Sequence, residues 1–290
     1  MRPLLSTRLA LANLVAQAAI IFTGAVVRVT GSGLGCPTWP ECAPGSFTPT
    51  AHQAEGWHKL VEFGNRTLTF VLGAIALALV ISAFKSHSER RIRIFALTPL
   101  IGVLAQAVIG GITVLTKLHS GTLLLHFLVS VWLVWASARL WFELSNPNRQ
   151  PAALESLWVG RVALWSGTAV MLLGSLTTSS GPHSGDGEVA SSLAIDPRLT
   201  SWLHADSVWL FVGSLSAAWI LASVKRLPAK ASHSLKVLTA LALSQAALGY
   251  LQYYTGLPWP LVAIHVLVAA AFWTTLVVFS FRAREVDSAS

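Results

Sequence analysis

Two stretches decide the fold: QAVIGGITVLTKLHSGTLLLH at residues 106–126 and QAALGYLQYYTGLPWPLVAIH at residues 245–265. Both are largely apolar, and both begin with Gln-Ala and end with His. Five residues of the first stretch return in the second at one constant offset: Gln106, Ala107, Gly110, Thr116 and His126 become Gln245, Ala246, Gly249, Thr255 and His265. Repetition at a fixed spacing indicates that the chain is built from two similar halves.

Composition places both halves in a membrane. Of the 290 residues, 54% are hydrophobic and only 11% are charged, whereas a soluble domain carries about a quarter charged residues. A helix needs about 20 mostly apolar residues to cross the bilayer. Eight segments meet this requirement, and we predict spans at residues 9–29, 60–84, 94–115, 121–142, 157–179, 203–224, 235–255 and 260–281. The first apolar run continues well past its Ala-Gln-Ala motif, which favours a span over a cleaved signal peptide.

The basic residues indicate how these spans are oriented. Most of the 20 Lys and Arg residues lie at the two termini and in the loops after the second, fourth and sixth spans. Cytoplasmic loops of membrane proteins carry such an excess, so both termini are predicted to be cytoplasmic. The net charge of +8 is thereby explained by topology, and no nucleic-acid partner is expected.

The predicted fold is an all-α integral membrane protein with eight transmembrane helices arranged as two four-helix bundles. Each half contains an even number of spans, so both halves have the same orientation. We expect a pseudo-twofold axis along the membrane normal to relate them. The predicted N-terminal half comprises residues 1–143, a cytoplasmic linker covers 144–156, and the C-terminal half comprises 157–290.

Four of the nine histidines are predicted near the outer ends of even-numbered spans: His58, His126, His204 and His265. Each half then offers two imidazoles from different helices at similar depth, which suits the two axial ligands of a low-spin haem. A lone membrane histidine is more simply explained by a bond between helices, but a repeated pattern favours metal ligation. Zinc is less favoured, because the second half lacks nearby Cys or extra carboxylates. His119 is the alternative ligand in the first half, and Pro258 occupies its repeat position.

Charged residues distinguish the first half from the second. Glu55, Glu62 and Arg66 are predicted to share one helical face with His58. At the offset between His58 and His204 their counterparts are Ser201, Val208 and Val212. A haem that only transfers electrons needs no such charges, whereas a site that moves protons does. We therefore predict a functional role for Glu55, while Glu62 and Arg66 are equally well explained as an i,i+4 ion pair.

A glycine-rich stretch, GSGLGCPTWPEC at residues 31–42, follows the first span on the predicted outer side. It contains both cysteines of the chain, Cys36 and Cys42. That compartment is oxidising, so a disulfide is expected. The pair is either a structural staple or a redox-active disulfide that reacts with a partner, and two cysteines alone cannot form a cysteine-rich metal site.

These features together resemble the haem A synthase family: the GSGLGCPTWPEC loop, the E-x-x-H of Glu55 and His58, and the histidines of spans four, six and eight. The resemblance covers all eight spans. It implies oxidation of a methyl group of haem O to the formyl group of haem A, through successive hydroxylations, for terminal oxidases. It further implies a resident haem b between His204 and His265, which acts as an electron relay.

The same resemblance implies that substrate haem O lies between His58 and His126, with Glu55 essential. Many members of the family have Arg after the first histidine, where this chain has Lys59. Lys is not equivalent to Arg at a carboxylate clamp, so Arg66 or Arg28 are alternative propionate ligands, and Lys59 is also explained by reaching to the membrane interface.

The resemblance implies a location in the cell membrane, with the haem sites and the cysteine loop toward the outer side. Haem O and membrane lipid are the expected partners. Haem O synthase, an electron acceptor, a thiol–disulfide partner and a second copy of the chain are left open by the sequence. Two other functions also fit parts of the pattern: a di-haem electron-transfer protein that modifies nothing, and a transporter built on parallel repeats.

Overall fold

The computed structural model describes residues 2–147, 149–181, 193 and 195–287. Eight helices lie in this part of the chain: α1 (Arg2–Val29), α2 (His58–Ser86), α3 (Arg90–Leu115), α4 (Ser120–Ser145), α5 (Leu154–Ser180), α6 (Pro197–Ser223), α7 (Ala229–Tyr254) and α8 (Trp259–Arg284). All eight are long and apolar enough to cross a membrane. The predicted all-α fold with eight spans is therefore confirmed, and the chain is a multi-pass membrane protein.

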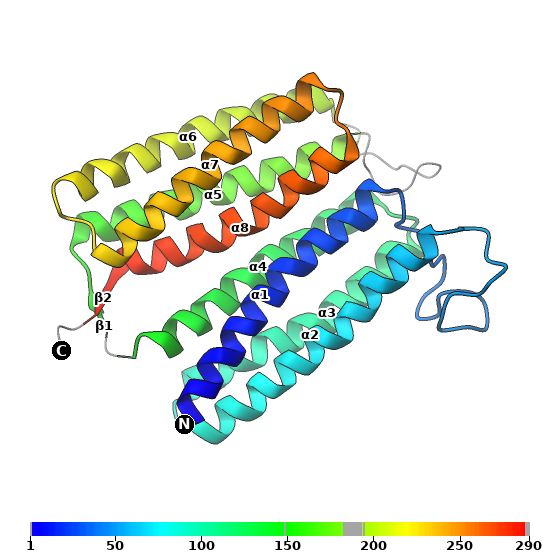
Figure 1. Ribbon diagram of the computed structural model, residues 1–290, viewed down its shortest axis with the longest axis horizontal. Coiled ribbons are helices and arrows are strands. Elements are labelled where there is room, and N and C mark those ends of the chain that lie inside the picture. The colour runs from blue at the N-terminus through cyan, green and yellow to red at the C-terminus, as the bar shows by residue number, and fades with distance from the viewer. Residues whose placement is uncertain (1, 148, 182–192, 194, 288–290) are drawn as a thin grey trace.

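The helices run between two ends of the molecule (Figure 1). One end, called the terminal end, carries both chain termini and the connections from α2 to α3, α4 to α5 and α6 to α7. The opposite end, called the loop end, carries the long connection from α1 to α2, residues 30–57, which we call the first loop. Both termini lie at the same end because the number of helices is even.

A short pair of strands was not predicted from the sequence. Strand β1 (Arg149–Pro151) lies between α4 and α5, and it pairs antiparallel with β2 (Glu285–Asp287), which directly follows α8. The backbone N–H of Ala152 also donates to the carbonyl of Arg284 at 2.8 Å. The connection between the halves is thereby tied to the C-terminal segment. Strands of three residues show too little hydrophobic pattern to be predicted.

Contacts between helices follow the same scheme in both halves. In the first half α1 packs against α2 and α4, and α3 packs against α2 and α4; the corresponding contacts join α5, α6, α7 and α8. Between the halves α1 packs against α8, α4 against α5, and α4 against α8. A twofold rotation that exchanges the halves exchanges the first two contacts and preserves the third. This is the contact pattern that a pseudo-twofold axis requires.

The core between the halves is apolar and tightly packed. It includes Leu14, Val134, Phe211, Leu276 and Phe279, contributed by α1, α4, α6 and α8. The indole Nε1 of Trp273 in α8 donates to the carbonyl of Val131 in α4 at 2.9 Å. Lipid tails are as apolar as these side chains, so packing and hydrogen bonds, more than burial from water, hold the halves together.

Candidate functional site

Three of the four predicted histidines lie well inside their helices at the loop end. His126, His204 and His265 stand about two helical turns after the starts of α4, α6 and α8. His58 departs from this arrangement, because it is the first residue of α2. All four histidines thus lie within about the first two turns of even-numbered helices, with His58 at the first residue and the other three further along.

His204 and His265 form the histidine pair of the second half. The two rings lie within electrostatic reach of each other. A Cβ atom placed on Gly174 would stand 3.0 Å from Cε1 of His204, and one on Gly249 would stand 3.7 Å from Cε1 of His265. Each histidine is thus packed against a residue without a side chain. Each glycine therefore allows a histidine ring to pack directly against the neighbouring helix, with Gly174 in α5 beside His204 and Gly249 in α7 beside His265.

The ring nitrogens of this pair are not fully used. Nδ1 of His204 and Nδ1 of His265 are buried and have no hydrogen-bond partner among the residues that the structure describes. The backbone of Val170 in α5 approaches the His204 ring, but without the geometry of a hydrogen bond to Nδ1. A buried imidazole nitrogen without a partner is costly, so the pair is suited to a ligand that the protein itself does not provide.

His126 has matching surroundings in the first half. A Cβ atom on Gly110 would stand 3.5 Å from its Cε1, and its buried Nδ1 has no hydrogen-bond partner within the described ranges. Nε2 of Gln106 donates to the carbonyl of His126 at 2.9 Å. Gln245 makes the same bond to the carbonyl of His265 at 3.1 Å. The repeated glutamines therefore brace the helical turn that carries each histidine, a role that the repeat alone did not indicate.

His58 is oriented by the first loop instead. Oγ of Ser32 lies 2.8 Å from Nδ1 of His58 and 2.8 Å from Oγ1 of Thr30. The ring of Trp57 stacks on the imidazole with the centroids 4.0 Å apart. The first loop can lie close to the start of α2 because residue 35 is glycine, and a side chain there would collide with the backbone of His58. Ser32 thus holds one ring nitrogen as a partner of a metal-binding histidine does, and the other nitrogen is left to bind a ligand.

Glu55 lies in the turn before α2 and not on the helix. The predicted single helical face is therefore wrong for this residue. The backbone N–H of His58 donates to the carbonyl of Glu55 at 3.1 Å, and Gly56 between them has a φ of 56°, which glycine adopts readily. Oε2 of Glu55 is buried without a hydrogen-bond partner in the described part of the chain. Such an oxygen is available to take up a proton close to His58.

Glu62 and Arg66 form the ion pair that was one of their two interpretations. Nη2 of Arg66 lies 2.6 Å from Oε1 of Glu62, which is 5% exposed. The pair also fastens the first loop to α2. The N–H of Cys36 donates to Glu62 at 2.6 Å, and Arg66 donates to the carbonyls of Cys36, Thr38 and Glu41 at 2.8–3.1 Å.

Cys36 and Cys42 form the expected disulfide. Both cysteines are 0% exposed, because the loop folds them against α2. Nε2 of Gln53 donates to the carbonyl of Gly35 at 2.8 Å. This bond links the later part of the first loop to the segment that carries Cys36. A partner can therefore reach the sulfur atoms only after the first loop has moved.

The other two cationic side chains considered from the sequence, Lys59 and Arg28, donate hydrogen bonds to backbone carbonyls. Nζ of Lys59 donates to the carbonyls of Thr50 and Ala51 at 2.6 and 3.3 Å, so it binds the first loop. Nη2 of Arg28 donates to the carbonyl of Thr178 in α5 at 3.2 Å, which links the two halves. His119, the alternative ligand, caps α4: its Nδ1 accepts from the N–H of Gly121 at 3.2 Å.

No cluster of three or more His, Cys, Asp or Glu side chains able to hold a metal ion is found in the described ranges. The candidate ligands are therefore pairs of histidines, one pair from α2 and α4 and one from α6 and α8. In the first half, Oε2 of Glu55, three residues before His58, has no hydrogen-bond partner among the described residues, and the second half has Ser201 at the corresponding position.

Comparison with known proteins identifies relatives of the chain. The family described as "Cytochrome oxidase assembly protein" matches residues 7–182. The haem A synthase of Geobacillus thermodenitrificans is 31% identical over 108 residues, which cover 37% of this chain and 32% of that protein. The haem A synthase of Exiguobacterium sibiricum is 32% identical over 114 residues, 39% of this chain and 37% of that protein. The chain thus aligns with about a third of the length of these relatives. The haem A synthase of Bacillus licheniformis is 26% identical over 225 residues, 72% of this chain and 71% of that protein.

Proposed function

Because the chain belongs to the haem A synthase family of cytochrome oxidase assembly proteins, we propose that it oxidises the methyl group of haem O to the formyl group of haem A. One observation carries this proposal. Both halves brace a buried histidine with the same Gln and Gly, at Gln106 and Gln245 and at Gly110 and Gly249. Among the residues that the structure describes, a buried carboxylate oxygen without a partner is found only in the first half, at Glu55, three residues before His58.

We assign a resident haem b to the second half. His204 and His265 would hold it. Their burial, their mutual proximity, the glycine beside each ring and the unpartnered Nδ1 atoms support this fit. When bound, such a haem supplies one-electron transfer, while the protein supplies the ligands and the dry surroundings that tune it. At the positions that correspond to Glu55, Glu62 and Arg66, this half has Ser201, Val208 and Val212.

In the first half the protein binds and orients the substrate. His58 and His126 would bind the iron of haem O, and Ser32 holds Nδ1 of His58 so that the other ring nitrogen faces the ligand. Oxidation of a methyl group removes hydrogen, in steps that we take to be successive hydroxylations. A proton acceptor is therefore required, and we assign this role to Glu55, whose Oε2 is buried without a partner among the described residues, three positions before His58.

We assign Glu62 and Arg66 a structural role and no part in proton transfer. They hold the first loop against α2, and that loop carries Ser32 and Glu55. Arg28 and Lys59 donate to backbone carbonyls, so neither is assigned to a haem propionate. In the cell membrane the loop end would face outward, since most basic residues lie at the terminal end.

The test is product analysis. The full chain is produced aerobically in cells that make haem O but not haem A, and the extracted haems are identified by mass and by their pyridine haemochrome spectra. Haem A is expected with the native chain and not with the isosteric Glu55→Gln variant. Protein that holds haem b while haem O stays unchanged would instead identify a di-haem electron carrier. Protein without any haem would refute both the ligand assignment and the activity.

A further inference from the structure

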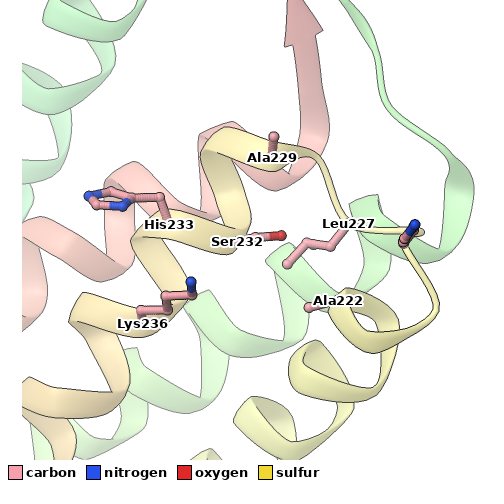
Figure 2. Close-up of a pocket in the computed structure, with 7 residues that line it drawn as sticks. Ala222, Leu227, Ala229, Ser232, His233 and Lys236 are labelled. Carbon is pink, nitrogen blue, oxygen red and sulfur yellow. The ribbon is translucent and has the colours of Figure 1, made fainter.

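A basic hollow lies on the surface at the terminal end, between the end of α6 and the start of α7. Its volume is about 530 Å³. Its lining residues, most of them labelled in Figure 2, are Ala222, Lys225, Leu227, Ala229, Ser232, His233 and Lys236. The lining contains two lysines and a histidine and no acidic residue, so the hollow carries a positive charge.

The repeat explains why this junction is open. Position 93 in α3 corresponds to position 232 in α7, by the same offset that relates Gln106 to Gln245. In the first half Arg93 donates to the carbonyls of His87 and Phe84 at 2.8 and 3.4 Å, and its guanidinium lies 5.3 Å from the Phe84 ring centroid. The long side chain of Arg93 therefore covers the junction between α2 and α3. Ser232 is too short to do so, and α6 and α7 also touch only sparsely.

The basic side chains of the hollow form no ion pair within the described part of the chain. Lys225, His233 and Lys236 are exposed, and their side chains make no hydrogen bond or ion pair with any residue that the structure describes. The neighbouring Arg226 is different, because it pairs with Glu155 at 3.0 Å. The hollow is thus able to accept an anion without first breaking an ion pair.

Apolar side chains continue from the hollow along both helices. Ile220 in α6 is 64% exposed, and Val224, just after the end of α6, is 57% exposed. On α7, Val237 and Leu243 are 41% and 68% exposed. In a membrane protein these exposed faces contact lipid. A molecule in the hollow therefore meets cationic groups at the helix ends and a hydrocarbon-like surface beside them. A phospholipid with a negative headgroup has this combination of an anion and acyl chains.

We propose that the hollow between α6 and α7 binds the phosphate-bearing headgroup of an anionic phospholipid, with the acyl chains lying along the apolar faces of the two helices. Basic pockets between transmembrane helices are suited to such headgroups. The hollow lies at the terminal end of the molecule, whereas the histidines lie toward the loop end (Figure 1). Binding there is independent of the haem chemistry proposed above, so either proposal can fail alone.

The experiment measures lipid binding to the full chain, purified in a neutral detergent. Phosphatidylglycerol is titrated and the bound lipid is counted by native mass spectrometry, with phosphatidylcholine and inorganic phosphate as separate arms. The Lys225→Gln/Lys236→Gln variant is expected to weaken phosphatidylglycerol binding roughly 30-fold, since each surface lysine attracts an anionic lipid by about a factor of five. Lys85→Gln, which removes a charge from the end of α2 at the same end of the molecule, is the control and should change little.

Ser232→Arg separates a shaped site from simple attraction. The substitution adds a positive charge but fills the hollow in the way that Arg93 covers the corresponding junction. We expect it to weaken phosphatidylglycerol binding about tenfold or more, whereas non-specific attraction would strengthen binding. Unchanged binding in the double lysine variant, stronger binding with Ser232→Arg, or equal occupancy by phosphatidylcholine would overturn the proposal. Full competition by millimolar inorganic phosphate would also overturn it, because the site would then be one for a free anion. Helical content and elution volume verify that each variant is folded.

Discussion

Replacement of Arg66 by Met tests whether the ion pair holds the first loop on α2. Methionine keeps much of the aliphatic length but removes the five N–H donors of the guanidinium. Within the described residues Glu62 would keep only the N–H of Cys36 as a partner, and the carbonyls of Cys36 and Thr38 would lose their donor. The carbonyl of Glu41 would lose Arg66 but keep the hydroxyl of Thr38.

The expected cost follows from burial. The side chains of Glu62 and Arg66 are 6% and 22% exposed, so the pair is largely withdrawn from water. Removing one partner of a buried pair costs about 3–5 kcal/mol. Because Arg66 is partly exposed, we take the lower end, about 3 kcal/mol, which corresponds to roughly a 150-fold change in an equilibrium constant. The cost applies to closure of the loop, since the other contacts of α2 are unchanged.

The assay is the rate at which a thiol reduces the Cys36–Cys42 disulfide, followed by alkylation and mass analysis. Both cysteines are fully buried, so reduction proceeds through loop opening, and its rate follows the open fraction. Arg66→Met should raise the rate about 150-fold. Lys59→Met removes two other hydrogen bonds from α2 to the same loop and should raise it only a few-fold. A rate for Arg66→Met within threefold of the native chain would refute the reasoning.

Three further predictions concern the histidine sites. His265→Ala should lose the absorbance of the resident haem, because one of its two proposed ligands is removed. Glu55→Gln should slow formation of haem A by about 10²- to 10⁴-fold, the usual contribution of a proton-transfer group, and leave the resident haem spectrum unchanged. Gln245→Leu should weaken retention of the resident haem, whereas Gln106→Leu should leave that haem in place and impair binding of haem O; optical titration with each haem measures both.

Each of these predictions has an outcome that contradicts it. A full haem spectrum in His265→Ala would show that another residue is the ligand. Native turnover in Glu55→Gln would restrict Glu55 to a structural role in the turn before α2. Equal effects of the Gln106 and Gln245 substitutions on the resident haem would mean that the two glutamines stabilise the whole bundle rather than one histidine each.

The sequence predicts the membrane architecture because apolar runs are a local signal. All eight expected spans coincide with helices. The largest difference at a helix start is that α1 begins at Arg2 and not at residue 9, since a helix can continue beyond the apolar core of the bilayer into polar residues. The repeat likewise singled out His126 and His265 without any structure, because the offset is visible in the sequence.

The contacts of the first loop could not be predicted in the same way. Ser32 contacts His58 because of the conformation of the first loop, and an irregular loop has no periodic sequence pattern that would predict this contact. The glycines around Ser32 indicate only a loop. Glu55 was expected on the helix, but Gly56 adopts a left-handed conformation and α2 begins at His58. Helix boundaries depend on such single conformations, and spacing arguments that cross a boundary fail.

The reciprocal contacts between the halves have a consequence for how such a protein can diverge. A single four-helix unit of this shape would expose the face of α4 or α8 to lipid. Two identical units would bury this face by packing against each other, as the subunits of a homodimer do. In a homodimer, however, each substitution appears in both subunits. Joining the units in one chain removes that constraint. In a fused chain one half can change while the other keeps its residues. The first half has Glu55 where the second half has Ser201, and a homodimer could not carry such a difference.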